Sequence, residues 1–111
     1  QALMLYTDST PSAYVPLVEK ALASETLIPV SLSMTIFAYE AFLKRGHRKK
    51  EILTEIETRW GAMLKRGADT FWETDKGADD FSRAGSLCHG WSAVPVYMFG
   101  KYYAEDVFGG V

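Results

Sequence analysis

Apolar residues recur at helical spacing in several stretches of the chain, and these stretches predict its helices. The first short helix is expected to begin near Pro16, because a proline in the first turn loses no hydrogen bond, and to end near Ser24. The next helix is expected to start at a cap formed by Ser31 or Ser33 and to stop at Gly46.

The third predicted helix has the clearest pattern, and Gly67 ends it. Lys65 and Arg66 suit the negative end of its dipole. Its apolar face is expected to consist of Ile52, Leu53, Ile56, Trp60, Met63 and Leu64.

Residues 68–90 have no helical period and are expected to form a long loop. A last helix is predicted from about Trp91 to Ala104, provided that Pro95 lies in its first turn. No stretch alternates convincingly with the period of two that a half-buried strand would show, so the expected fold class is all-α.

The composition suggests that the apolar faces belong to something larger. Hydrophobic residues make up 48% of the 111 residues and aromatic residues 14%, which is a large apolar content for so short a chain. The predicted helix before Gly46 is apolar on more than one side, as is usual for a helix buried inside a larger assembly. We therefore expect a fragment, with self-association or a missing upstream part covering the exposed faces.

The charges and the single cysteine limit the kinds of partner. The net charge is −2, and acidic and basic residues are mixed, so neither nucleic acid nor a membrane is expected as a partner. The one basic run, residues 44–50, is interpreted as a solvated turn. Cys88 has no second cysteine to pair with, and the two histidines lack metal-ligand spacing, so no metal and no cofactor is expected.

Glu73 and Trp72 form the first candidate site. An indole ring can stack on the C–H face of a sugar, and a neighbouring carboxylate can hold a water molecule or a sugar hydroxyl. From composition alone, an ordinary alternative is that Trp72 belongs to the core and Glu73 lies on the surface.

His89 and Trp91 flank a glycine at the predicted start of the last helix. A neutral imidazole donates one hydrogen bond and accepts another, which suits a sugar hydroxyl. The alternative is a histidine at a helix start that is bonded only to the backbone.

Taken together, these segments resemble the end of the catalytic domain of glycoside hydrolase family 78, the α-L-rhamnosidases. Residues 60–73 read WGAMLKRGADTFWE and residues 86–97 read SLCHGWSAVPVY. They are similar to a family pattern in which a W-x-x-M-L-x-x-G-A-T-T-x-W-E run precedes an S-x-N-H-x run. The resemblance extends over residues 31–97, and it rests on the order of the two motifs more than on either motif alone.

The resemblance implies that residues 1–111 are a C-terminal fragment holding the last few helices of an (α/α)6 barrel. It also implies an inverting hydrolase that releases terminal α-L-rhamnose from a carbohydrate substrate. Glu73 would then be the general base, and the general acid would lie in an upstream part of a longer parent protein. His89 would contact the sugar, and Trp72 and Trp91 would be walls of the sugar pocket.

Two positions depart from the family pattern and leave the substrate open. Asp69 stands where threonine or alanine is usual, and Cys88 stands where asparagine is typical. Other expectations are therefore kept beside the rhamnosidase: a hydrolase of the same barrel type acting on another sugar, a non-hydrolytic or degenerate carbohydrate-binding barrel, or a small helical interaction domain. The last would bury Trp72 and Trp91 and turn Glu73 to solvent, whereas the hydrolase would place Glu73 beside His89 on a concave surface.

Overall fold

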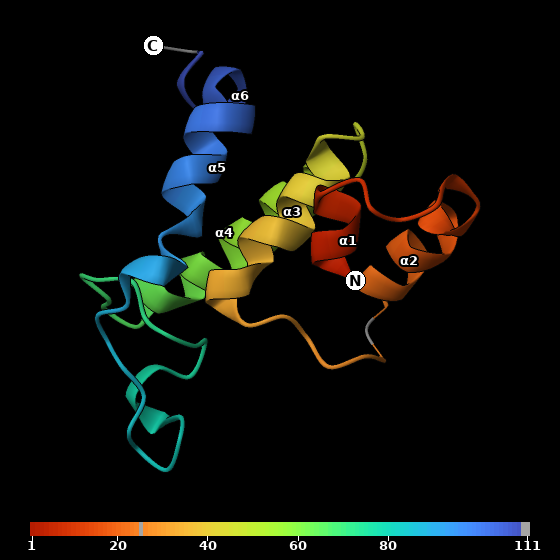
Figure 1. Ribbon diagram of the computed structural model, residues 1–111. Helices are drawn as coiled ribbons and strands as arrows, with labels where there is room; N and C mark the ends of the chain where they lie inside the picture. The colour runs from red at the N-terminus through yellow and green to blue at the C-terminus, as the bar shows by residue number, and fades with distance from the viewer. Residues whose placement is uncertain (25, 110–111) are drawn as a thin grey trace.

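The computed structural model describes residues 1–24 and 26–109, and within them the regular structure is entirely helical (Figure 1). Single 3-10 turns at Ser12–Tyr14, Leu32–Met34, Gly77–Asp79 and Gly90–Ser92 connect some of the helices. The α-helices are α1 (Ala2–Tyr6), α2 (Val15–Leu22), α3 (Thr35–Leu43), α4 (Lys49–Lys65), α5 (Val94–Tyr102) and α6 (Ala104–Phe108). The expectation of an all-α chain is confirmed.

Most predicted helices are present, and their ends follow local signals. Pro95 lies in the first turn of α5, where its missing N–H does no harm. Gly46 and Gly67 follow α3 and α4 with φ of +74° and +84°, a conformation that glycine adopts without steric cost. Two short helices, α1 and α6, were not predicted as separate elements.

The predicted serine cap of α3 is wrong. A 3-10 turn at Leu32–Met34 intervenes, so α3 begins only at Thr35. The hydroxyls of Ser31 and Ser33 lie 3.5 Å from each other, and neither caps a helix.

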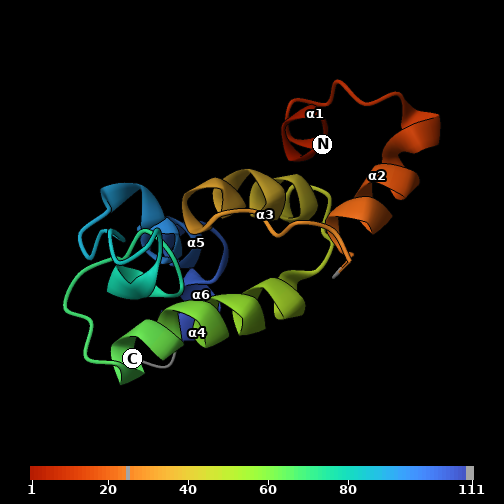
Figure 2. The same ribbon diagram turned by 90° about the horizontal axis from the view of Figure 1, so that it is seen from below.

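A hairpin of α3 and α4 organises the molecule. The two helices are joined by a short turn and lie side by side, with α1 and α2 near the turn (Figure 2). The segment before α5 contacts the opposite end of α4, where Trp60 donates to the Ser92 carbonyl, and Tyr103 after α5 donates to the carbonyl of Lys49 at the start of α4. On α4 the buried residues repeat at helical spacing, which places them on the face toward α3 and α5. The core cluster consists of Leu32, Tyr39, Phe42, Ile52, Ile56, Trp60, Met63, Trp72, Val94, Met98 and Tyr103.

The molecule is flat and leaves large apolar side chains exposed. Its principal extents are 44 × 42 × 21 Å, and its radius of gyration is 15.0 Å. A compact domain of about this length would have a radius near 13 Å. Leu17 on α2 and Leu64 on α4 are 64% and 71% exposed, so one residue of the predicted α4 face is not covered. None of the described helices combines the length and the apolar character that crossing a bilayer requires.

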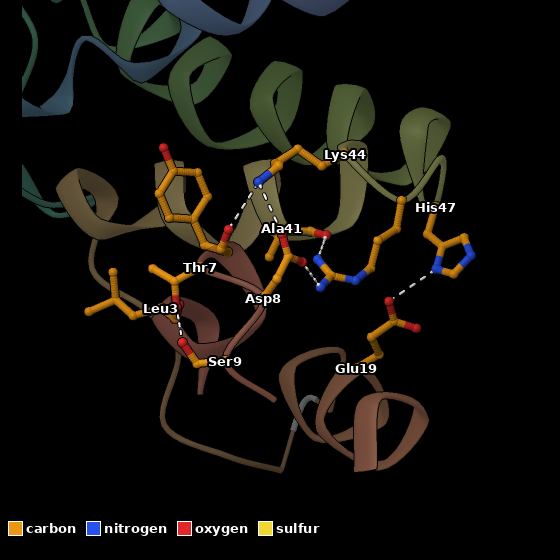
Figure 3. A network of polar contacts seen from close by, with 10 residues as sticks. Leu3, Thr7, Asp8, Ser9, Glu19, Ala41, Lys44 and His47 are labelled. Atoms are coloured by element: carbon orange, nitrogen blue, oxygen red, sulfur yellow. Dashed lines mark hydrogen bonds and ion pairs between the residues drawn. The ribbon is translucent and has the colours of Figure 1, made fainter. Parts of the chain in front are cut away.

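Acidic residues contact part of the basic run after α3, and most of that run is exposed, as its interpretation as a solvated turn expects (Figure 3). The guanidinium of Arg45 donates to a carboxylate oxygen of Asp8 at 2.6 Å. Lys44 donates to the Tyr6 carbonyl at 3.0 Å. Glu19 on α2 lies 3.1 Å from Nδ1 of His47. These contacts attach α1 and α2 to the hairpin.

Candidate functional site

The two segments that carry the candidate residues lie side by side in antiparallel directions. The backbone N–H of Glu73 donates to the Ser86 carbonyl at 2.9 Å. The N–H of His89 donates to the Phe71 carbonyl at 2.7 Å. The hydroxyl of Thr70 also donates to a backbone carbonyl of the second segment. Residues 70–73 and 86–89 are therefore held together across the intervening loop.

Glu73 is half-buried, and its carboxylate is tied to the second segment. The backbone N–H of Ser86 donates to its Oε2 at 3.3 Å. No hydrogen bond from a described residue reaches Oε1 of the same carboxylate. One oxygen therefore orients the side chain, while the other remains able to accept a proton or a hydrogen bond.

Trp72 lies in the core, with only 7% of its surface exposed. The guanidinium of Arg66 lies 4.8 Å from the ring centroid, within the range of a cation–π contact. Gly77 approaches the ring so closely that a Cβ there would lie 2.7 Å from it. In this structure Trp72 supports the segment from within, and its expected role as a sugar-stacking wall stays a prediction.

Arg59 of α4 and Arg66, the residue that follows α4, hold the loop after Glu73. The guanidinium of Arg66 donates to the carbonyls of Asp75 and Lys76 at 2.9 and 3.2 Å. Arg59 donates through Nε and a terminal nitrogen to both carboxylate oxygens of Asp75, at 3.3 and 3.1 Å. Such two-point pairing restricts orientation as well as distance. Sequence reasoning missed both anchors, because no local sequence signal shows which residue an arginine at or near a helix end will pair with.

His89 immediately precedes the 3-10 turn Gly90–Ser92 and is half-buried. Its backbone is engaged on both sides, since its N–H donates to Phe71 and its carbonyl accepts from Ser92. Among the described residues its imidazole ring makes no hydrogen bond, so the ring itself is not bonded to backbone there. Its expected contact with a sugar stays a prediction.

Trp91 lies on the turn itself and is 78% exposed. Trp72 is buried, Trp91 is exposed and Glu73 is half-buried. A small interaction domain was expected to bury both tryptophans and to expose Glu73, and a hydrolase was expected to use both tryptophans as pocket walls. The arrangement agrees fully with neither expectation.

An apolar groove of about 630 Å³ runs beside the candidate segments, between α4 and α5. Glu73, His89 and Trp91 do not line it. Its walls include Trp60, whose indole N–H donates to the Ser92 carbonyl at 2.8 Å and so ties α4 to the start of α5. The remaining lining residues are Ile56, Glu57, Gly61, Met63, Leu64, Ala68, Asp69, Thr70, Phe71, Pro95, Val96 and Phe99.

Over residues 1–24 and 26–109, no three His, Cys, Asp or Glu side chains gather as ligands of a metal ion would.

Comparisons of the chain with protein-family models, with curated proteins and with solved structures found no significant match.

Proposed function

We propose that this chain is the base-bearing part of an inverting glycoside hydrolase of the α-L-rhamnosidase type, with Glu73 as the general base. The resemblance of the two motifs suggests the family. The observation that supports the assignment is the direct pairing of the two motif segments around Glu73, since Ser86 bonds to both its backbone and its carboxylate. Residues that act on one substrate must lie close together, and residues 70–73 and 86–89 lie side by side.

The proposed chemistry needs one carboxylate that takes a proton and one acid that gives a proton. Water attacks the anomeric carbon as the glycosidic C–O bond breaks, and Glu73 accepts the proton of that water. An upstream acid in a longer parent protein protonates the departing oxygen. In inverting enzymes the two carboxyl groups lie about 6.5–9.5 Å apart, which leaves room for the water. The Ser86 N–H would orient Oε2 while Oε1 receives the proton.

We also propose that these helices are the last ones of an (α/α)6 barrel. The flat shape and the apolar groove between α4 and α5 support it. Helices from the upstream part of a barrel would cover Leu64 and Val96, which are 71% and 64% exposed. Burying such side chains is the main source of stability in helix packing.

The second candidate is a non-hydrolytic, carbohydrate-binding barrel of the same ancestry. The exposed indole of Trp91 favours it, because a ring that is 78% exposed can stack on a sugar without any catalytic partner. Cys88, which stands where the family pattern has asparagine, also allows a different sugar specificity.

The experiment compares Glu73→Gln with Glu51→Gln in the longer protein that carries the upstream acid. Glu51 is a suitable control because it is an exposed glutamate of α4 that does not line the groove between α4 and α5. With an aryl α-L-rhamnoside, Glu73→Gln should lower kcat by about 10²–10⁴-fold, the usual contribution of a general base, while Glu51→Gln should leave it unchanged.

Proton NMR of the first product should show β-L-rhamnose before mutarotation, as inversion requires. Undiminished turnover by Glu73→Gln would overturn the general-base assignment. A lack of turnover by the wild-type protein, combined with saturable sugar binding, would favour the binding protein.

A further inference from the structure

A second cavity, of about 470 Å³, lies between the α3–α4 hairpin and the segment after α2, and Glu73 does not line it. Unlike the groove between α4 and α5, it has both charged and apolar walls. The apolar walls include Leu22, Leu27, Phe42 and Ile52. The volume falls within the range of about 300–1,000 Å³ found for small-molecule sites, which are mostly apolar with a few polar groups that orient the ligand.

Arg48 lines this cavity and has no anionic partner among the described residues. It is half-buried, yet no ion pair and no side-chain hydrogen bond from a described residue reaches its guanidinium. Other basic residues of the same run are paired. Arg45 contacts Asp8 at 2.6 Å, and Lys49 contacts Asp106 at 2.8 Å. Because removing a charge from water is costly unless acceptors meet it, Arg48 is the group of this cavity that an anion would stabilise.

The position of the Arg48 side chain leaves its donors accessible to a ligand. The guanidinium lies over the ring of Phe42, 5.2 Å from its centroid, and Phe42 lines the same cavity. A guanidinium over a ring still has its N–H groups free, because they point outward in its own plane. The backbone of Arg48 has a φ of +57°, a conformation that glycine adopts more readily than arginine. Such strained residues are common at binding sites.

The other charges of the cavity balance one another. Glu55 and Arg59 line it further along α4 and lie 3.3 Å apart, and Arg59 also pairs with Asp75. Arg48, Ile52 and Glu55 follow one another on one stripe of the helix. At a rise of about 1.5 Å per residue, Glu55 lies about 10 Å from Arg48 along the helix axis, with Ile52 between them. The cavity therefore has a free positive charge at one end and an apolar wall beside it.

We propose that this cavity binds a small monocarboxylate with an apolar body. The carboxylate accepts two N–H groups of Arg48, in the two-point geometry that suits a guanidinium. The apolar body lies against Ile52 and Leu22. A cation is repelled by Arg48, a neutral molecule leaves its charge unpaired, and a second negative charge on the ligand would lie near Glu55. The proposal does not rest on the assignment of Glu73.

The test titrates the purified 111-residue chain with hexanoate at pH 7, where the carboxylate is ionised. Hexanol and hexylammonium have the same apolar body with no charge or the opposite charge, and acetate has the charge without the body. ¹H–¹⁵N spectra follow the side-chain Nε–H of Arg48 and the backbone amide of Ile52. Hexanoate should shift both signals in a saturable way and should bind about tenfold or more tightly than the other three probes.

Arg48→Gln should weaken hexanoate binding about 10- to 100-fold, as the loss of hydrogen bonds from a charged group implies. The matched control is Lys50→Gln, which removes a positive charge from an exposed residue of the same basic run that does not line the cavity. It should change the affinity by no more than about twofold, because salt screens exposed charges. Arg48→Lys keeps the charge without the planar donors, so its affinity should lie between those of the wild type and Arg48→Gln.

Three results would overturn the proposal. The first is an absence of saturable hexanoate binding, or equally tight binding of hexanol, hexylammonium or acetate. The second is equal hexanoate affinity of Arg48→Gln and Lys50→Gln; if Arg48→Gln does not fold, wild-type affinity of Arg48→Lys has the same meaning. The third is hexanoate binding that Glu73→Gln abolishes, which would assign the ligand to the other site. Glu73→Gln should instead bind hexanoate as the wild type does, whatever its effect on hydrolysis in the longer protein, so the two proposals can fail separately.

Discussion

Substituting Gly77 by alanine tests whether the loop after Glu73 is held by its close approach to Trp72. Gly77 has a φ of +61°, and a Cβ there would lie 2.7 Å from Cε3 and 2.9 Å from Cζ3 of the Trp72 ring. The ring cannot easily retreat, because it is buried in the core and the guanidinium of Arg66 lies 4.8 Å from its centroid. Either the loop or the indole has to move.

The expected loss of unfolding free energy in Gly77→Ala is the sum of two separate costs. A side chain in the left-handed region costs about 1–2 kcal/mol. Overpacking against a fixed ring costs about 1–3 kcal/mol. Gly77→Ala should therefore lower the free energy of unfolding by about 2–5 kcal/mol, a large share of the ~5–15 kcal/mol of a typical domain.

Two other glycines serve as controls: Gly46 has the backbone cost alone, and Gly61 has neither cost. Gly46 has a φ of +74° but nothing within 4 Å of an added Cβ, so Gly46→Ala should lose only the backbone cost of about 1–2 kcal/mol. Gly61 lies inside α4 with open space around it, so Gly61→Ala should gain about 0.5–1 kcal/mol from helix propensity.

The assay is urea unfolding followed by circular dichroism and by tryptophan fluorescence, with equal m-values required before the midpoints are compared. The fluorescence of Trp72 should also change in folded Gly77→Ala and not in folded Gly46→Ala. If Gly77→Ala loses no more stability than Gly46→Ala, the contact between the loop and the ring is not what holds the loop, and the reasoning is refuted.

Two further predictions concern the attachment of α5. Burial raises the pKa of Glu40, but hydrogen bonds from Lys101 and the neighbouring tyrosine hydroxyls outweigh it, so the pKa is held below its ordinary value of 4.5. This carboxylate therefore contributes stability above about pH 4.5, and that contribution is lost as the pH falls through the folded pKa. In that pH range the free energy of unfolding of the wild type should fall more steeply than that of Glu40→Gln. Equal slopes of unfolding free energy against pH for the two proteins would contradict the assignment. Trp60→Phe removes the donor to the Ser92 carbonyl and part of the core packing, and should cost about 1–3 kcal/mol in urea unfolding; a smaller loss would show that this bond does not hold α5 in place.

The periodic pattern predicted the helices well because helix formation depends on neighbours three and four residues apart. Ile52, Ile56, Trp60 and Met63 were expected on one face of α4, and all four are buried together. Leu64 was expected with them and is 71% exposed, because it lines the open groove between α4 and α5. Periodicity predicts which residues share a face but not whether another element covers it.

The candidate site could be predicted only in part. The sequence singled out Glu73 and His89 by residue type and by motif order, and the structure brings their segments together through backbone hydrogen bonds. The sequence contained no signal that Trp72 would be enclosed by Arg66 and Gly77. That enclosure depends on how a loop without periodic pattern folds back on α4.

The helical class, the helix ends near Gly46 and Gly67 and the place of Pro95 in a first turn could therefore be predicted from the sequence, since each follows from the geometry of a few consecutive residues. The bond between Glu73 and Ser86 and the burial of Tyr39 beside Glu55 and Arg59 could be known only from the folded structure. These contacts join residues distant in the sequence, and they depend on which surfaces pack together once the helices have formed.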